Sequence, residues 1–104
     1  MAQYKTEAQF MLSVKKYAEL VGWLYYHPYD SRKSNAGFPD CVFVRDGRIV
    51  FAELKLATKG YRSKPSEYQA IWLEELNRVA DNTAFVEVYL WNPDDWDTIE
   101  SVLK

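Results

Sequence analysis

The chain has 104 residues, of which 48% are hydrophobic and 16% aromatic, which is enough apolar material for one globular core. This length predicts a single domain over residues 1–104. The chain lacks a run of about 18 apolar residues, which excludes a membrane span, and its single cysteine excludes an internal disulfide. Its polar start does not resemble a signal peptide, so the sequence favours a cytosolic protein. The net charge of −2 does not exclude a nucleic-acid partner, because residues 1–66 hold 11 of the 13 Lys and Arg residues and only six of the 15 Asp and Glu residues.

The first predicted element is a helix over residues 6–21. Thr6 and Gln9 have the spacing of a capping box, and apolar side chains then recur at helical intervals. The predicted core-facing positions are 7, 11, 14, 18 and 21. Glu7 on such a stripe would be costly unless it were paired or bound to a metal, which makes it a candidate site residue. The alternative is that an acid in the first turn only interacts with the helix dipole.

A hairpin is the clearest local signal in the chain. A short aromatic strand at residues 23–27 and a loop at residues 28–39 precede it. Residues 40–45 and 48–56 then form strand-like runs on either side of Asp46-Gly47, which predicts a two-residue type I′ turn. Such a turn fixes the register: Arg45 faces Arg48, and counting outward brings Asp40 opposite Glu53.

The predicted register puts two carboxylates on one face of the hairpin, about 4.5–5.5 Å apart at Cβ, and Lys55 falls on the same face. Two carboxylates this close repel each other. A shared proton, the Lys55 ammonium, or a divalent metal such as Mg²⁺ or Mn²⁺ could offset the repulsion. The simpler alternative is an exposed hairpin end with solvated charges and an ordinary Glu–Lys pair.

The rest of the chain completes an α-β-β-β-α-β-α order. Residues 57–64 read as a basic loop, and residues 84–91 as a strand before a short helix that starts near Trp96. Between them, Ser66 and Gln69 predict a capping box that begins a helix ending near Ala80. The capping box by itself explains Gln69. This order predicts an α/β fold with a mixed central sheet flanked by helices.

Three segments resemble the VRR-NUC family of the PD-(D/E)XK nuclease superfamily. They are Gly37-Phe38-Pro39-Asp40, Glu53-Leu54-Lys55 and Ser66-Glu67-Tyr68-Gln69. The resemblance covers nearly the whole chain and implies a restriction-endonuclease-like core. It also implies metal-dependent hydrolysis of DNA phosphodiester bonds with Mg²⁺ or Mn²⁺. Small stand-alone phage and bacterial members look like homodimeric, structure-specific endonucleases on branched DNA such as Holliday junctions, and other relatives act in DNA repair.

The resemblance also implies roles for individual residues. Asp40 and Glu53 would hold the metal, with the Leu54 carbonyl as a further ligand. Lys55 would position or activate the attacking water. Gln69 would support the site from its helix, and Glu7 looks like the acid that many relatives carry on the first helix. Five basic residues that flank the site in sequence could hold the phosphate backbone: Arg32, Lys33, Lys59, Arg62 and Lys64.

Other functions are compatible with the same residues. One is a non-catalytic DNA-binding module that keeps the fold, and another is a protein-interaction domain that uses the acidic residues after Glu67. A sequence-specific restriction-type nuclease is a weaker alternative, because the chain has little room for a recognition subdomain. The intact Asp40, Glu53 and Lys55 set favours the nuclease.

Overall fold

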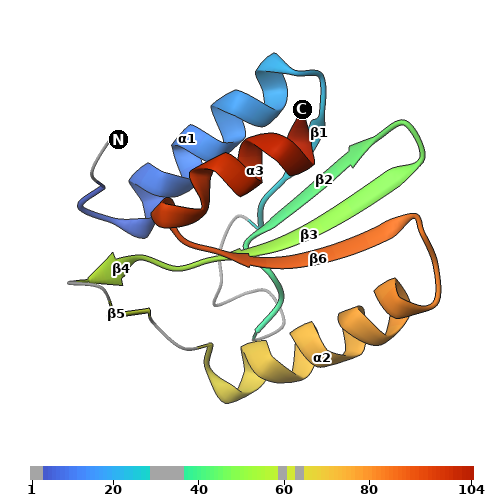
Figure 1. Cartoon of the computed structure of the whole chain (residues 1–104). Coiled ribbons are helices and arrows are strands. Elements are labelled where there is room, and N and C mark those ends of the chain that lie inside the picture. Colours follow the sequence, from blue (N-terminus) through green and yellow to red (C-terminus); the bar gives the residue numbers. More distant parts are fainter. Residues whose placement is uncertain (1–3, 29–36, 59–60, 63–64) are drawn as a thin grey trace.

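The protein is built on a four-stranded mixed sheet with helices on both faces (Figure 1). The structure is a computed structural model that describes residues 4–28, 37–58, 61–62 and 65–104. The elements in chain order are α1 (Glu7–Leu20), β1 (Leu24–Tyr26), β2 (Cys41–Arg45), β3 (Arg48–Leu54), β4 (Ala57–Thr58), β5 (Tyr61–Arg62), α2 (Glu67–Asp81), β6 (Val86–Trp91), the 3-10 helix η1 (Pro93–Asp95) and α3 (Trp96–Leu103). No helix in these ranges is long and apolar enough to cross a membrane.

The sheet order is β1-β2-β3-β6, with antiparallel pairs β1–β2 and β2–β3 and a parallel pair β3–β6. This confirms the predicted α/β class and the mixed sheet. The prediction that residues 57–64 form only a loop was wrong, since β4 and β5 make a short antiparallel pair there. Strands of only two residues show too little alternation of apolar and polar residues to be recognised in a sequence.

The hairpin register is the predicted one. Arg45 pairs with Arg48, and the ladder runs to Cys41 opposite Ala52. Asp46 and Gly47 have φ values of 51° and 78°, as a type I′ turn requires at both central positions. Because the turn fixes the pairing along the whole hairpin, it also determines which residues lie opposite each other at the far end, where the predicted site lies.

The buried core lies between the sheet and the pair α1 and α3, which share one face (Figure 1). The buried side chains of α1 are Phe10, Val14 and Ala18, and those of α3 are Ile99 and Leu103. The predicted placement of Glu7 on the core-facing stripe was therefore wrong, because Glu7 is exposed in the first turn of α1. Helix α2 covers the opposite face, where its inward residues are only half-buried.

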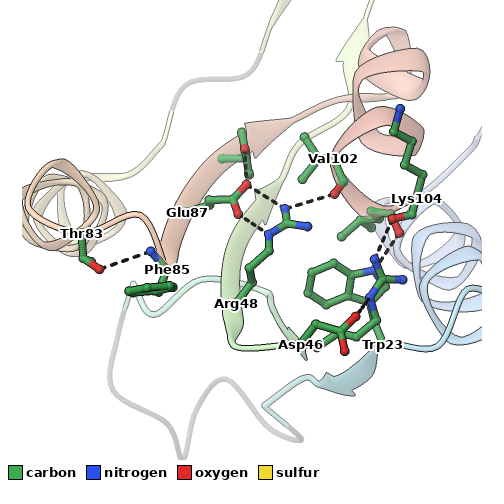
Figure 2. A network of polar contacts seen from close by, with 11 residues as sticks. Trp23, Asp46, Arg48, Thr83, Phe85, Glu87, Val102 and Lys104 are labelled. Atoms are coloured by element: carbon green, nitrogen blue, oxygen red, sulfur yellow. Dashed lines mark hydrogen bonds and ion pairs between the residues drawn. The ribbon is translucent and has the colours of Figure 1, made fainter.

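Arg45 and Arg48, which lie beside Trp23, link the C-terminal helix α3 to the hairpin (Figure 2). Arg48 makes a two-pronged ion pair with Glu87, at 2.7 and 3.0 Å, and donates to the Val102 carbonyl. Arg45 donates to the Lys104 carbonyl at 2.6 Å, and both guanidinium groups lie over the Trp23 ring. This cluster lies at the turn end of the hairpin, so we assign it to stability rather than to the predicted site.

Arg48→Ala should lower the free energy of unfolding by about 2 kcal/mol, because it leaves the half-buried Glu87 carboxylate without its cation. Urea denaturation measures this change. Arg78→Ala is the matched control, since Arg78 is exposed and pairs loosely with Glu74 and Glu75 on one helix surface. That control should change stability by less than about 0.5 kcal/mol. Equal losses in the two variants would contradict a special role for the Arg48 cluster.

Candidate active site

The predicted site residues of the hairpin meet at the C-terminal end of β3. The pairing after Cys41–Ala52 would be Asp40 with Glu53, but the ladder ends before it. The Asp40 side chain contacts the main chain of β3 directly instead: its Oδ2 accepts a hydrogen bond of 2.8 Å from the Leu54 N–H. The main chain of β3 thus holds Asp40 beside the Glu53-Leu54 segment.

Glu53 is the central and most buried charged side chain of this group, at 1% exposure. Its Oε2 accepts a hydrogen bond from Gln69 Nε2 at 2.5 Å and lies 3.5 Å from Lys55 Nζ. Its Oε1 is buried and has no hydrogen-bond partner among the described residues. A buried carboxylate oxygen without a partner costs about 1–3 kcal/mol, and an ion or water at that position is the usual explanation.

The environment favours the neutral form of Glu53. Burial and then the nearby Asp40 charge raise the pKa of Glu53 from 4.5 to about 7, against the opposing effects of Lys55 and of the Asp40 backbone N–H. The repulsion between the two carboxylates that the register predicted is therefore present in the structure. The Lys55 ammonium alone does not offset this repulsion, so the Asp40 and Glu53 carboxylates still favour binding of a proton or a metal ion.

Gln69 makes the predicted capping contact and also a hydrogen bond to Glu53. Its Oε1 accepts from the Ser66 backbone N–H at 2.8 Å, which completes the capping box of α2. Its Nε2 donates to Glu53 across the space between α2 and the sheet. An amide can bridge in this way because it carries an acceptor and two donors. The first turn of α2 therefore fixes the orientation of the Glu53 carboxylate.

The segment Gly37-Phe38-Pro39-Asp40 is wedged between the sheet and α2. The Phe38 ring contacts Phe51 of β3 and Trp72 of α2, both edge-on, at centroid distances of 6.2 and 5.1 Å. Pro39 is buried, and Asp40 then reaches the end of β3. The packing of this segment therefore sets the distance between Asp40 and the helix that carries Gln69.

Gly37 permits this packing, with a φ of +87° and a close approach to α2. A Cβ there would clash with the Tyr68 carbonyl and lie 2.7 Å from the Gln69 backbone nitrogen. Gly37→Ala should therefore lower the free energy of unfolding by about 2–4 kcal/mol, measured by urea denaturation. Gly22→Ala has a similar φ of +94°, and a Cβ there would meet only the Arg45 side chain at an ordinary 3.9 Å, so it should lose only about 1 kcal/mol. Equal losses would show that the close approach to α2 does not matter.

His27 is a neighbour of the site that the sequence interpretation missed. Its Nδ1 lies 2.7 Å from the Asp40 backbone carbonyl, although the two residues are 13 positions apart. No local pattern marks a contact of that kind, because it depends on the pairing of β1 with β2. Cys41, by contrast, points into the core, and burial raises the pKa of its thiol to about 12, so it is no nucleophile.

One predicted site residue lies away from this cluster, and the five predicted DNA-binding residues have no described side chains. Glu7 is exposed at the start of α1, away from the buried face of that helix. Arg32, Lys33, Lys59 and Lys64 lie outside the described residues, and Arg62 is described only as part of the backbone of β5. The structure therefore brings together Asp40, Glu53, Lys55 and Gln69, with the Leu54 main chain between them.

The donor set suits a hard divalent cation with few protein ligands. Within the described ranges, no group of three or more His, Cys, Asp or Glu residues could form an all-protein metal site. Mg²⁺ commonly binds through one or two carboxylates and completes its shell with water and substrate phosphate oxygens. Asp40 and the unpartnered Oε1 of Glu53 fit that requirement.

No protein-family model matches the chain, and no curated protein matches it.

Proposed function

We propose that this protein is a metal-dependent nuclease that hydrolyses DNA phosphodiester bonds, with the restriction-endonuclease-like core that its VRR-NUC resemblance implies. The observation that supports the proposal best is the Glu53 carboxylate. It is buried beside Asp40, bound by Gln69 and Lys55 through one oxygen, and unpartnered at the other. A group that only stabilised the fold would be expected to have both oxygens satisfied.

The position of the cluster in the sheet also supports the proposal. β3, α2 and β6 form a parallel unit in which Leu54 pairs with Trp91, the last residue of β6. The cluster thus lies where two parallel strands end and a helix begins (Figure 1). Binding sites in α/β sheets favour this edge, because the strand ends and the loops after them leave a crevice there.

Each residue has a defined task in the proposed reaction. A bound Mg²⁺ or Mn²⁺ would polarise the scissile phosphate and lower the pKa of a bound water. Asp40 and Glu53 would hold the cation, with the Leu54 carbonyl as a further ligand. Gln69 and the Leu54 N–H keep the two carboxylates in fixed orientations. Lys55, which is mostly buried, would orient the attacking water and neutralise charge that develops on the phosphate.

The proposed substrate class is branched DNA, such as a four-way junction or a flap, and the proposed active form is a homodimer. The test is cleavage of labelled four-way junction, flap, single-stranded and linear duplex DNA in Mg²⁺, in Mn²⁺ and with the metal chelated. We expect cleavage with either cation and none after chelation. A folded protein that binds branched DNA but cleaves none of these substrates would instead be the non-catalytic DNA-binding module.

A further inference from the structure

Asn92 is a buried residue at the end of β6 whose side-chain amide is not satisfied. It follows Trp91, the last residue of the strand, and has 2% of its surface exposed. Its Oδ1 accepts a hydrogen bond of 2.9 Å from the Asp94 N–H, but its Nδ2, which carries two donor protons, has no partner among the described residues. A buried donor without an acceptor costs free energy, which indicates that an acceptor such as water or a ligand binds there.

The register of the sheet brings Asn92 to the same face and the same end of the sheet as Glu53 and Lys55. The last pair of the parallel β3–β6 ladder joins Leu54 and Trp91, and the Lys55 N–H then donates to the Trp91 carbonyl at 2.9 Å. Asn92, one position further, therefore lies alongside Lys55. Its backbone is extended, with φ −125° and ψ 174°, so its side chain leaves the strand on the side opposite to that of Trp91. Trp91, whose Nε1 is also unpaired, packs in the core on the α1 face, so Asn92 faces the α2 side, as Glu53 does.

The unpaired groups on the α2 face have opposite chemical requirements. Glu53 Oε1, when ionised, needs a cation or a donor, whereas Asn92 Nδ2 needs an acceptor, and the Lys55 ammonium beside it can also only donate. A phosphate offers anionic acceptor oxygens, and hydrogen bonds to such oxygens are stronger than those to neutral ones. A neutral amide also adds a donor next to Lys55 without the repulsion that a second ammonium would cause. Lys55 and Asn92 together therefore match a phosphate, while the carboxylates match the cation.

We propose that Asn92 is a further substrate-binding residue of the candidate active site, and that its Nδ2 donates to an oxygen of the scissile phosphate beside Lys55. This inference rests on the proposed nuclease function and adds to it a residue that none of the three motif segments contains. The hydrogen bond from Asp94 to Oδ1 fixes the plane of the amide, so Nδ2 is oriented before the substrate binds. A donor held in this way stabilises charge on the phosphate without a cost of reorientation during the reaction.

Inorganic phosphate tests this contact in the wild type without cleavage. The side-chain amide signals in a ¹H–¹⁵N spectrum, assigned through the backbone, are followed while phosphate is added to the metal-free protein. At about pH 6 a carboxyl with a pKa of about 7, as Glu53 has, is mostly neutral and repels the anion little. We expect the Asn92 amide signal to shift and to saturate with phosphate. The amides of Asn77 and Asn82, which are exposed and donate to carbonyls of α2, should stay unchanged.

Two substitutions at Asn92 separate the amide donor from the capping oxygen. Asn92→Ser keeps an oxygen that can accept from the Asp94 N–H, and Asn92→Asp keeps the side-chain shape as well, but both lack the donor. Asn92→Ser should reduce single-turnover cleavage about 10- to 100-fold, as expected for the loss of one hydrogen bond to a charged oxygen. Asn92→Asp should lose more, because its carboxylate repels the phosphate. Asn82→Asp, the same change at an exposed position at the far end of α2, should cleave within about twofold of the wild type.

Failure of this contact and failure of the nuclease give different results. If the wild type cleaves DNA and Asn92→Ser cleaves as fast, the nuclease stands and the role of Asn92 is overturned. A slow Asn92→Ser variant combined with an Asn92 amide signal that phosphate does not move would show a structural role only, and would also overturn the proposal. If phosphate shifts the Asn92 signal but no DNA is cleaved, the phosphate site is supported and the nuclease is not.

Discussion

Lys55→Met should reduce DNA cleavage about 10²- to 10³-fold while the protein stays folded. The Lys55 ammonium lies 3.5 Å from Glu53 Oε2 and is mostly buried, which in the proposed reaction would hold it where charge develops on the phosphate. Methionine keeps much of the side-chain length and apolar packing but removes the charge. Single-turnover cleavage at saturating DNA measures the loss in the chemical step separately from binding.

The loss of cleavage in Lys55→Met supports the proposed site only if removing a lysine elsewhere has no such effect. Lys16→Met removes a lysine from the exposed side of α1 and should leave the single-turnover rate within about twofold of the wild type. The double variant of Lys55→Met with Asp40→Asn should be no slower than the slower single variant, because residues that act as one unit lose their function together. Multiplicative losses in the double variant, or an unchanged rate in Lys55→Met, would contradict the proposed site.

The part of the site that could be predicted from the sequence follows from local chemistry. Asp46-Gly47 requires positive φ at both positions and thereby determines the pairing of every residue outward to Cys41. Period-2 alternation then puts Glu53 and Lys55 on one face. The capping box of Ser66 and Gln69 is equally local, so the start of α2 was predicted correctly.

The remainder depends on contacts between distant segments. In α1, the stripes through Glu7 and through Phe10 both contain Val14 and Ala18, and only the packing of α1 against the sheet and α3 selects the Phe10 stripe. The proximity of His27 to Asp40 needs the β1–β2 pairing. The second role of Gln69, its bond to Glu53, needs the close approach of α2 that Gly37 permits. No spacing rule within a helix or hairpin contains this information.

Glu53→Gln should change how the stability of the metal-free protein depends on pH. The pKa of Glu53 is raised from 4.5 to about 7, chiefly by burial and then by Asp40, so the folded protein binds this proton more tightly than the unfolded chain does. The resulting stabilisation is complete below about pH 4.5 and is lost as the pH rises through about 7. For Glu53 alone the loss amounts to about 3 kcal/mol, and glutamine at this position has no such proton to lose.

Urea denaturation of both proteins across this pH range, with the metal chelated, measures the difference in their stabilities. The wild type should lose stability relative to Glu53→Gln as the pH rises, by up to about 3 kcal/mol. Added Mg²⁺ should restore much of the loss in the wild type near pH 8, because a cation bound only by the folded state stabilises it, and should do little for the variant. Parallel pH profiles would show that Glu53 is not held in a destabilising environment. A Mg²⁺ effect of equal size in both proteins would place the cation elsewhere than at this carboxylate.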